Sequence, residues 1–252
     1  MNEKIIDTFH INKPIIGMLH LNGFTPENVH DLAKREIELM YANGVDAVLV
    51  ENYYGNADDC AWALEYLQSQ YKDYVYGVNI LGNSELAFQL ANEYGAAFIQ
   101  IDSVCGHLTP KKDEILSREL AGLRENSSAF LLGGVRFKYQ PVKSGRTVEE
   151  DLLIGKYRCN AVVVTGSATG ESTDIEKIKL FREVLGNFPL IVGAGMNDEN
   201  CREQISIADG AIIGTFFKQN GETHNPVDSQ RVKRLMTIVK EVRDNDYTHS
   251  KY

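Results

Sequence analysis

The sequence lacks the features that mark secreted, membrane-spanning and metal-binding proteins. Its four cysteines (Cys60, Cys105, Cys159 and Cys201) are far apart and form no CxxC pair, so we expect free thiols in a reducing cytoplasm. No apolar run reaches the length of a signal peptide or of a membrane span, which predicts a cytoplasmic protein without membrane insertion. The six histidines include no HExxH pattern, and we expect neither a metal nor a cofactor.

Motifs of two common enzyme classes are missing as well. The chain contains neither the GxSxG elbow of serine hydrolases nor the GxxxxGK[ST] loop of nucleoside triphosphatases. Positive charge is also scarce, because the formal net charge is -9 and the sequence pI is about 5.2. Nucleic acids and anionic membranes attract surfaces rich in lysine and arginine, so neither is an expected partner.

The chain does contain an alternation of strand-like and helix-like segments. Short β-branched runs predict strands at residues 14–21, 46–52, 75–81, 97–102, 129–139, 161–166, 189–195 and 210–217. Amphipathic segments predict helices at residues 26–43, 57–71, 84–94, 113–126, 147–157, 174–185, 198–207 and 228–243. Eight βα units in 252 residues predict an α/β fold, a single (β/α)8 TIM barrel over residues 1–252 with a frayed tail at 244–252. A doubly wound sheet is disfavoured, because no GxGxxG turn follows the first strand.

Polar residues lie at the C-terminal ends of the predicted strands, where TIM barrels bind their ligands. Strand alternation points a set of them inward, which gives candidate catalytic residues (His20, Glu51, Asp102 and Lys138) and candidate ligand-binding residues (Asn79, Gln100, Arg136 and Thr165). Ion pairs at the barrel rim are the alternative explanation for the charged members. For His20 the alternative is a core histidine whose ring nitrogens are satisfied.

Glycines mark the last strands as a candidate phosphate site. We expect the backbone of Gly166, Gly193, Ala194, Gly195, Gly214 and Thr215 to bind phosphate, because glycine lets N–H groups approach an anion closely. Lys218 is expected to add positive charge. Tight turns without a ligand are the alternative. The loop of residues 165–173 is interpreted as a lid or second anion clamp, or else as a mobile surface loop.

These segments together resemble the BtpA/SgcQ family. The resemblance rests on KPIIGMLHL, GVDAVLVEN, YGVNILGN, AAFIQID, NAVVVTGSATG, PLIVGAGMNDEN and ADGAIIGTFFK, which occur in this order from Lys13 to about Met236. It implies a ribulose-phosphate-binding barrel, related to phosphoribosylanthranilate isomerase, with a phosphate pocket between the last strands. Family members are associated with photosystem I assembly or with sugar-metabolism genes, so the resemblance implies less about activity than about fold.

The chain departs from the family pattern at the mouth of the barrel. Asn22 to Pro26 stand where members often have a PPLPG turn, Gln100 stands where they tend to have arginine, and the GGVRFKY segment keeps Lys138 but has Tyr139 in the histidine place. These departures advise against transferring a substrate from the family.

The residues support two hypotheses about function. The first is an enzyme that acts on a phosphorylated sugar or phosphoribosyl compound by isomerisation, carbon–carbon cleavage or ribosyl transfer. Glu51 or Asp102 would move a proton and Lys138 would stabilise negative charge or form a Schiff base. The second is a non-catalytic phosphate-binding or assembly factor on the same scaffold. In both, the partner is a small phosphorylated molecule, and a homodimer is the default assembly.

Overall fold

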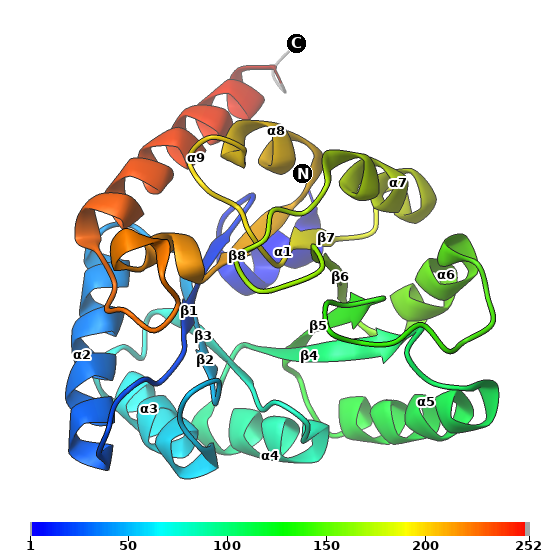
Figure 1. Ribbon diagram of the computed structural model, residues 1–252, viewed down its shortest axis with the longest axis horizontal. Coiled ribbons are helices and arrows are strands. Elements are labelled where there is room, and N and C mark those ends of the chain that lie inside the picture. Colours follow the sequence, from blue (N-terminus) through cyan, green and yellow to red (C-terminus); the bar gives the residue numbers. More distant parts are fainter. Residues whose placement is uncertain (1, 250–252) are drawn as a thin grey trace.

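The computed structural model describes residues 2–249 and contains a closed barrel of eight parallel strands (Figure 1). The strands occur in sequence order around the barrel, and β8 pairs with β1 to close it. They are β1 (Ile15–Leu19), β2 (Ala47–Glu51), β3 (Val75–Asn79), β4 (Phe98–Cys105), β5 (Phe130–Val135), β6 (Ala161–Val164), β7 (Leu190–Val192) and β8 (Gly210–Ile213). The predicted TIM barrel is therefore confirmed.

Eight helices surround the barrel and follow the strands one by one. They are α2 (Pro26–Ala42), α3 (Ala57–Gln70), α4 (Ser84–Tyr94), α5 (Pro110–Glu125), α6 (Val148–Arg158), α7 (Ile175–Leu185), α8 (Cys201–Ile207) and α9 (Ser229–His249). Local chemistry fixes their starts. Thr25 accepts a hydrogen bond from the backbone of Asn28 at the beginning of α2, and Thr147 and Glu150 form a capping box on α6.

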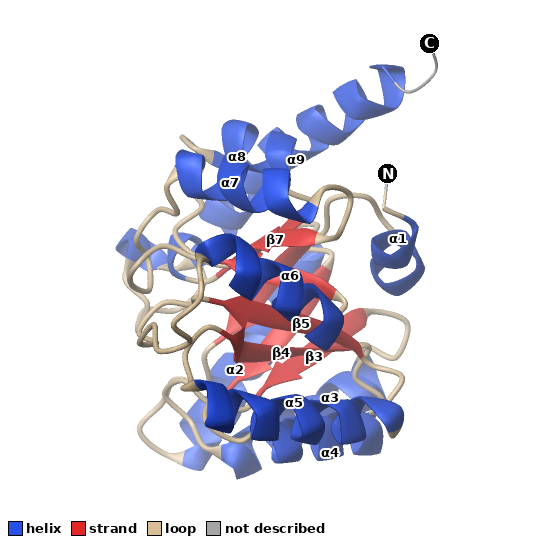
Figure 2. Ribbon diagram, turned by 90° about the vertical axis from the view of Figure 1, so that its right-hand side faces the viewer, coloured by secondary structure: helices blue, strands red, loops and turns tan. Residues whose placement is uncertain are grey.

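A further helix, α1 (Glu3–Phe9), closes the N-terminal end of the barrel and was not predicted from the sequence. The ring of Phe9 packs against Phe98 and Phe130, with ring centroids 5.1 and 6.0 Å apart. Figure 2 shows α1 on the side of the barrel opposite to the longer loops. This helix thus covers the N-terminal end of the barrel interior with the apolar side chains of Ile5 and Phe9.

Several predicted elements end at other residues than expected. β5 ends at Val135 and β8 at Ile213, where a 3-10 helix, Thr215–Phe217, follows after one residue. β4 continues to Cys105 across a register shift. α9 continues to His249, through most of the segment that we expected to be a frayed tail, and residues 250–252 lie outside the described residues.

The four cysteines are buried and free, as predicted. In the part of the chain that the structure describes, no helix has the length and apolar character needed to cross a membrane.

Candidate active site at the C-terminal ends of the strands

A small, partly open cavity lies at the C-terminal ends of the strands. Its volume is about 30 Å³, enough for about two water molecules. Its walls come from β1, β2 and β8 and from the segments that follow β1, β2, β5, β6, β7 and β8. They consist of Met18, His20, Glu51, Tyr53, Lys138, Thr169, Gly170, Gly193, Ala194, Gly195, Ile212, Gly214 and Thr215. The structure thus brings together three of the predicted catalytic residues and five of the six predicted phosphate-binding residues.

Glu51, the last residue of β2, is a buried carboxyl group in this cavity. Its Oε1 accepts a hydrogen bond from the side-chain amide of Asn79 at 2.8 Å. Burial raises the pKa of Glu51, and the nearby Asp102 raises it too, while Lys138 and the bond from Asn79 oppose the shift. The resulting pKa is about 7. A carboxyl group with this pKa can both donate and accept a proton near neutral pH.

Asp102 lies behind Glu51 and is connected to it through Asn79. The amide nitrogen of Asn79 lies 3.0 Å from Oδ1 of Asp102, and the amide nitrogen of Gln100 lies 3.1 Å from the same oxygen. The Oε1 atom of Gln100 is buried without a hydrogen-bond partner among the described residues. None of these three side chains lines the cavity. Asn79 orients the carboxyl group of Glu51 through its hydrogen bond, and Asp102, which Gln100 also contacts, raises the pKa of Glu51.

His20 follows β1 and is 3% exposed. Its Nδ1 atom is buried and has no hydrogen-bond partner among the residues described by the structure. Burial holds the pKa of His20 well below its usual value, and the positive charges of Lys218 and Lys138 lower it too. The ring is therefore neutral at pH 7. A buried polar atom without a partner carries a free-energy cost unless a ligand pairs with it.

Lys138 reaches the cavity from the loop after β5. Its ammonium group donates to Oγ1 of Thr169 at 3.1 Å, and its backbone N–H donates to Oγ1 of Thr165 at 2.9 Å. Thr165 is buried and thereby positions the main chain of Lys138. The hydroxyl group of Tyr53 also lies 3.5 Å from Oγ1 of Thr169. Sequence reasoning missed Tyr53 and Thr169, because both lie in loops where strand alternation does not apply.

Arg136 does not line the cavity, contrary to the prediction from strand alternation. Its Nε atom donates to Asp151 at 2.8 Å, and its terminal nitrogen donates to the carbonyl of Arg146 at 2.6 Å. The backbone of Arg136 is left-handed, with φ of 48°, so the alternation of β5 stops there and Phe137 joins the barrel interior instead. The rim ion pair that we had kept as an alternative is the arrangement observed for Arg136.

Lys218 is not available to a phosphate group either. It is buried, and its ammonium group lies 2.7 and 2.8 Å from the two carboxylate oxygens of Glu36 on α2. The same carboxylate accepts a bond from the backbone of Val227. This buried ion pair fastens the segment after β8 to α2, since neither charge could remain buried without the other.

The glycines of the predicted phosphate site make close contacts within the protein. A Cβ atom on Gly214 would lie 2.8 Å from Cε1 of His20, and one on Gly195, whose φ is 67°, would lie 1.9 Å from the carbonyl oxygen of Glu171. Gly166 does not line the cavity and borders a neighbouring pocket. The contacts explain why glycine is needed at these positions, and phosphate binding by their backbone stays a prediction.

The loop between β6 and α7 borders the cavity with Thr169 and Gly170. In Figure 1 it passes over the barrel opening, in front of α1. The hydroxyl of Thr173 donates to the carbonyl of Ala194 at 3.1 Å, and the amide of Asn200 donates to Ser172 at 2.9 Å and to Gly195 at 3.0 Å. The loop is thus docked on the turn after β7.

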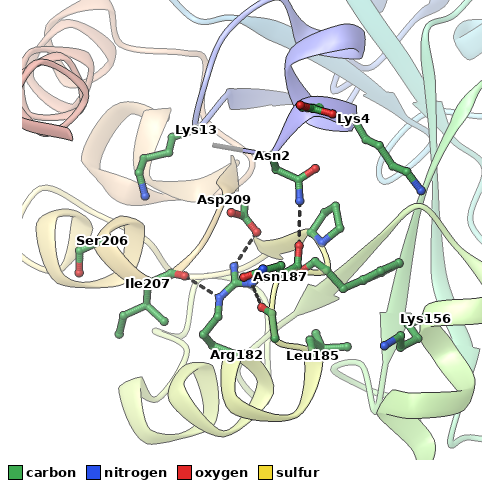
Figure 3. Close-up of a pocket in the computed structure, with 14 residues that line it drawn as sticks. Asn2, Lys4, Lys13, Lys156, Arg182, Leu185, Asn187, Ser206, Ile207 and Asp209 are labelled. Atoms are coloured by element: carbon green, nitrogen blue, oxygen red, sulfur yellow. Dashed lines mark hydrogen bonds and ion pairs between the residues drawn. The ribbon is translucent and has the colours of Figure 1, made fainter. Parts of the chain in front are cut away.

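A larger pocket of about 850 Å³ lies at the opposite, N-terminal end of the barrel (Figure 3). Arg182 is at the centre of its contacts and donates to the carbonyls of Ile207 and Phe188 and to Asp209. Asn2 binds the carbonyl of Asn187 at 3.0 Å. This end of a TIM barrel serves stability rather than catalysis, and its polar groups here tie α1 to the turn before β7. We therefore take the smaller cavity as the candidate functional site.

Comparisons with known proteins agree with this fold. A model of the BtpA family matches residues 11–241. An uncharacterized protein of Methanocaldococcus jannaschii is 31% identical over 92% of this chain and 97% of its own length. The photosystem I biogenesis protein BtpA of Synechocystis is 24% identical over 94% of this chain and 91% of its own length.

Two solved structures share the fold at low sequence identity. The first is the (S)-3-O-geranylgeranylglyceryl phosphate synthase of Thermoplasma acidophilum in complex with sn-glycerol-1-phosphate, with a TM-score of 0.62, 15% identity, and coverage of 96% of this chain and 98% of that one. The second is a phosphoribosylanthranilate isomerase of Thermotoga maritima, with a TM-score of 0.58, 14% identity, and coverage of 90% and 98%.

Proposed function

This chain belongs to the BtpA family, and from that premise we propose that it is an enzyme that acts on a small phosphorylated molecule of the sugar-phosphate or phosphoribosyl class. The observation that carries the proposal is the cavity at the C-terminal strand ends, in which a carboxyl group with a pKa of about 7, a neutral imidazole and an ammonium group face the same small space. Such a set is typical of proton-transfer catalysis.

The three side chains take different parts in this chemistry. Glu51 moves a proton to or from the substrate, because its carboxyl group is close to half protonated at pH 7. Lys138 stabilises the negative charge that develops on a substrate oxygen when the proton leaves. The unpartnered Nδ1 of His20 binds a hydroxyl group of the substrate. Isomerisation, carbon–carbon cleavage and ribosyl transfer all use these roles.

The phosphate group of the substrate would lie beside Gly193, Gly195, Gly214 and Thr215. Three arguments support this assignment. These residues border the same cavity as Glu51 and Lys138, and backbone N–H groups after the last two strands bind phosphate in many TIM barrels. In addition, the Thermoplasma synthase with the same fold holds a glycerol phosphate.

Substrate entry requires the loop over the cavity to open. A volume of about 30 Å³ is too small for a sugar phosphate, and Lys138 donates to Thr169 of this loop at the edge of the cavity. When the loop moves, Lys138 loses the hydroxyl of Thr169 and gains an oxygen of the substrate. Closure over the bound substrate then excludes water from the proton transfer.

A thermal-shift screen tests whether the cavity binds such a ligand. A sugar phosphate present at 100 times its dissociation constant would stabilise the protein by about 2.7 kcal/mol. We expect a clear rise in melting temperature with at least one ribose or ketose phosphate and no rise with the parent sugars. If no phosphate ester shifts the transition, the pocket assignment is wrong. The non-catalytic alternative predicts binding without turnover, and the substitutions Glu51→Gln and Lys138→Met would leave its biological role intact.

A further inference from the structure

A second pocket lies next to the cavity that contains Glu51, between the connections that follow β5 and β6. Its volume is about 410 Å³, and three cationic side chains from different segments border it, namely Arg136, Lys138 and Lys177. Lys138 also borders the cavity that contains Glu51 and so forms part of the wall between this cavity and the second pocket. Other polar residues in the lining are Tyr139, Gln140, Ser167, Ser172 and Asp174.

The positive charge in this pocket is only partly balanced by the protein. Arg136 is paired with Asp151. Lys177 donates to the carbonyl of Thr165 at 2.8 Å, and no carboxylate of residues 2–249 forms an ion pair with it or with Lys138. The pocket has one carboxylate in its lining, Asp174. Its Oδ1 accepts the bond that caps α7.

The half-buried position of Lys177 makes this charge costly. Burial lowers the pKa of Lys177, and the positive charge of Arg136 lowers it further. Lys177 and Arg136 face the same pocket, and their positive charges repel each other. This positive charge is local, because the protein as a whole has a net charge of -9. An anion beside Lys177 would offset the cost of burying its charge and provide strong hydrogen-bond acceptors.

We propose that this outer pocket, between the loops that follow β5 and β6, binds a second anionic group of the ligand, a phosphate or carboxylate held by Lys177 and Lys138. The inference rests on the proposed function, since it describes the far end of the same substrate. The reacting part of the substrate lies against Glu51 and His20, and Lys138 connects the two ends. The enzyme therefore acts on a molecule with two anionic groups rather than on a simple monophosphate.

Inorganic phosphate serves as the probe in a test of this second site. The melting temperature is measured at increasing phosphate and at constant ionic strength for the whole chain and for Lys177→Met. We expect the variant to need about tenfold more phosphate for the same rise, because it loses one charge-assisted contact. Lys177→Arg keeps the charge and is expected to keep the response. Lys179→Met on the same helix, which removes an exposed lysine paired with Glu176, is the matched control.

The possible outcomes separate this inference from the proposed function. If Lys177→Met responds to phosphate like Lys179→Met, or if the unmodified chain does not respond, the second anion site is wrong. Turnover of a phosphate ester that is lost in Glu51→Gln would still support the proposed function in that case. Acetate is the second probe. A response to phosphate alone assigns the site to a phosphate group, and a response to both assigns it to either oxyanion.

Discussion

The side-chain amide of Asn79 donates to Oε1 of Glu51 at 2.8 Å, and both groups are buried at the ends of adjacent strands. The same nitrogen lies 3.0 Å from Asp102. One neutral donor is thus shared by two carboxyl groups, which cannot both be charged at low cost in a buried site. Burial and the nearby Asp102 raise the pKa of Glu51 to about 7 even though the bond from Asn79 opposes the shift, and several measurable consequences follow from that pKa.

The first prediction concerns stability as a function of pH. The pKa of Glu51 is higher in the folded protein, at about 7, than its ordinary value of 4.5. The folded state therefore binds more protons than the unfolded state between these pH values, and the contribution of Glu51 to stability falls as pH rises through this window. Glu51→Gln removes this loss. We expect the variant to gain about 3 kcal/mol relative to the unmodified chain between pH 4.5 and pH 8, measured by urea unfolding.

Glu114→Gln, which changes an exposed glutamate on α5, is the control for this experiment. Its stability curve should run parallel to that of the unmodified chain. Parallel curves for Glu51→Gln as well would show that the carboxyl group of Glu51 does not have a raised pKa.

The second prediction concerns the charge of Lys138. The ammonium group of Lys138 lowers the pKa values of both Glu51 and His20. Lys138→Met removes this charge and keeps a similar chain length, so the pKa of Glu51 should rise further above 7 and that of His20 should move back towards 6.5. Carbon-13 resonances of the glutamate carboxyl and the histidine ring report both values during a pH titration. A pKa of Glu51 that stays the same or falls in this variant would contradict the position of Lys138 in the cavity.

The third prediction concerns the contact between Gly214 and His20. A methyl group at position 214 would lie 2.8 Å from Cε1 of the ring. Gly214→Ala should therefore displace His20 and destabilise the protein by about 1–3 kcal/mol. Gly122→Ala on α5 has open space around the new methyl group, and it should stabilise the protein by about 0.5–1 kcal/mol. Equal effects of the two substitutions on urea unfolding would rule out the tight contact.

The fourth prediction concerns the buried carboxylate of Asp151, which holds the loop that carries Lys138. Asp151 accepts bonds from Arg136, Arg146 and Ser144, and these bonds lower its pKa despite burial. Asp151→Ala would leave buried positive charge unpaired and cost about 3–5 kcal/mol. The exposed Asp73→Asn should change the free energy of unfolding by less than about 0.5 kcal/mol. A small effect of Asp151→Ala in urea unfolding would mean that the network does not hold the loop.

Sequence periodicity was sufficient for the barrel and for the residues on regular strands. Glu51 and His20 were located correctly, because β1 and β2 keep their alternation up to their ends. Arg136 was assigned to the wrong side, since a single left-handed residue ends the alternation and no sequence pattern announces it. Lys218 was misjudged because its partner, Glu36, is 182 positions away in the chain.

Other features depend on tertiary packing alone. The short helix α1 carries only two buried side chains, Ile5 and Phe9, which is too few for a recognisable helical pattern. The role of Thr169 depends on how the loop after β6 folds back over the mouth of the barrel. The sequence marked this loop as rich in glycine and threonine, but only the structure brings Thr169 against Lys138.

The most direct test of the account is turnover of phosphate esters followed by phosphorus-31 NMR. A panel of sugar monophosphates and bisphosphates is incubated with the unmodified chain, Glu51→Gln, Lys138→Met and the surface control Glu114→Gln. We predict that at least one ester is converted, that the control converts it at the normal rate, and that loss of the proton-transfer group in Glu51→Gln slows conversion by about 100-fold or more. The proposed enzymatic function would be contradicted if Glu51→Gln and Lys138→Met both converted the ester as fast as the unmodified chain. It would also be contradicted if the unmodified chain converted no ester.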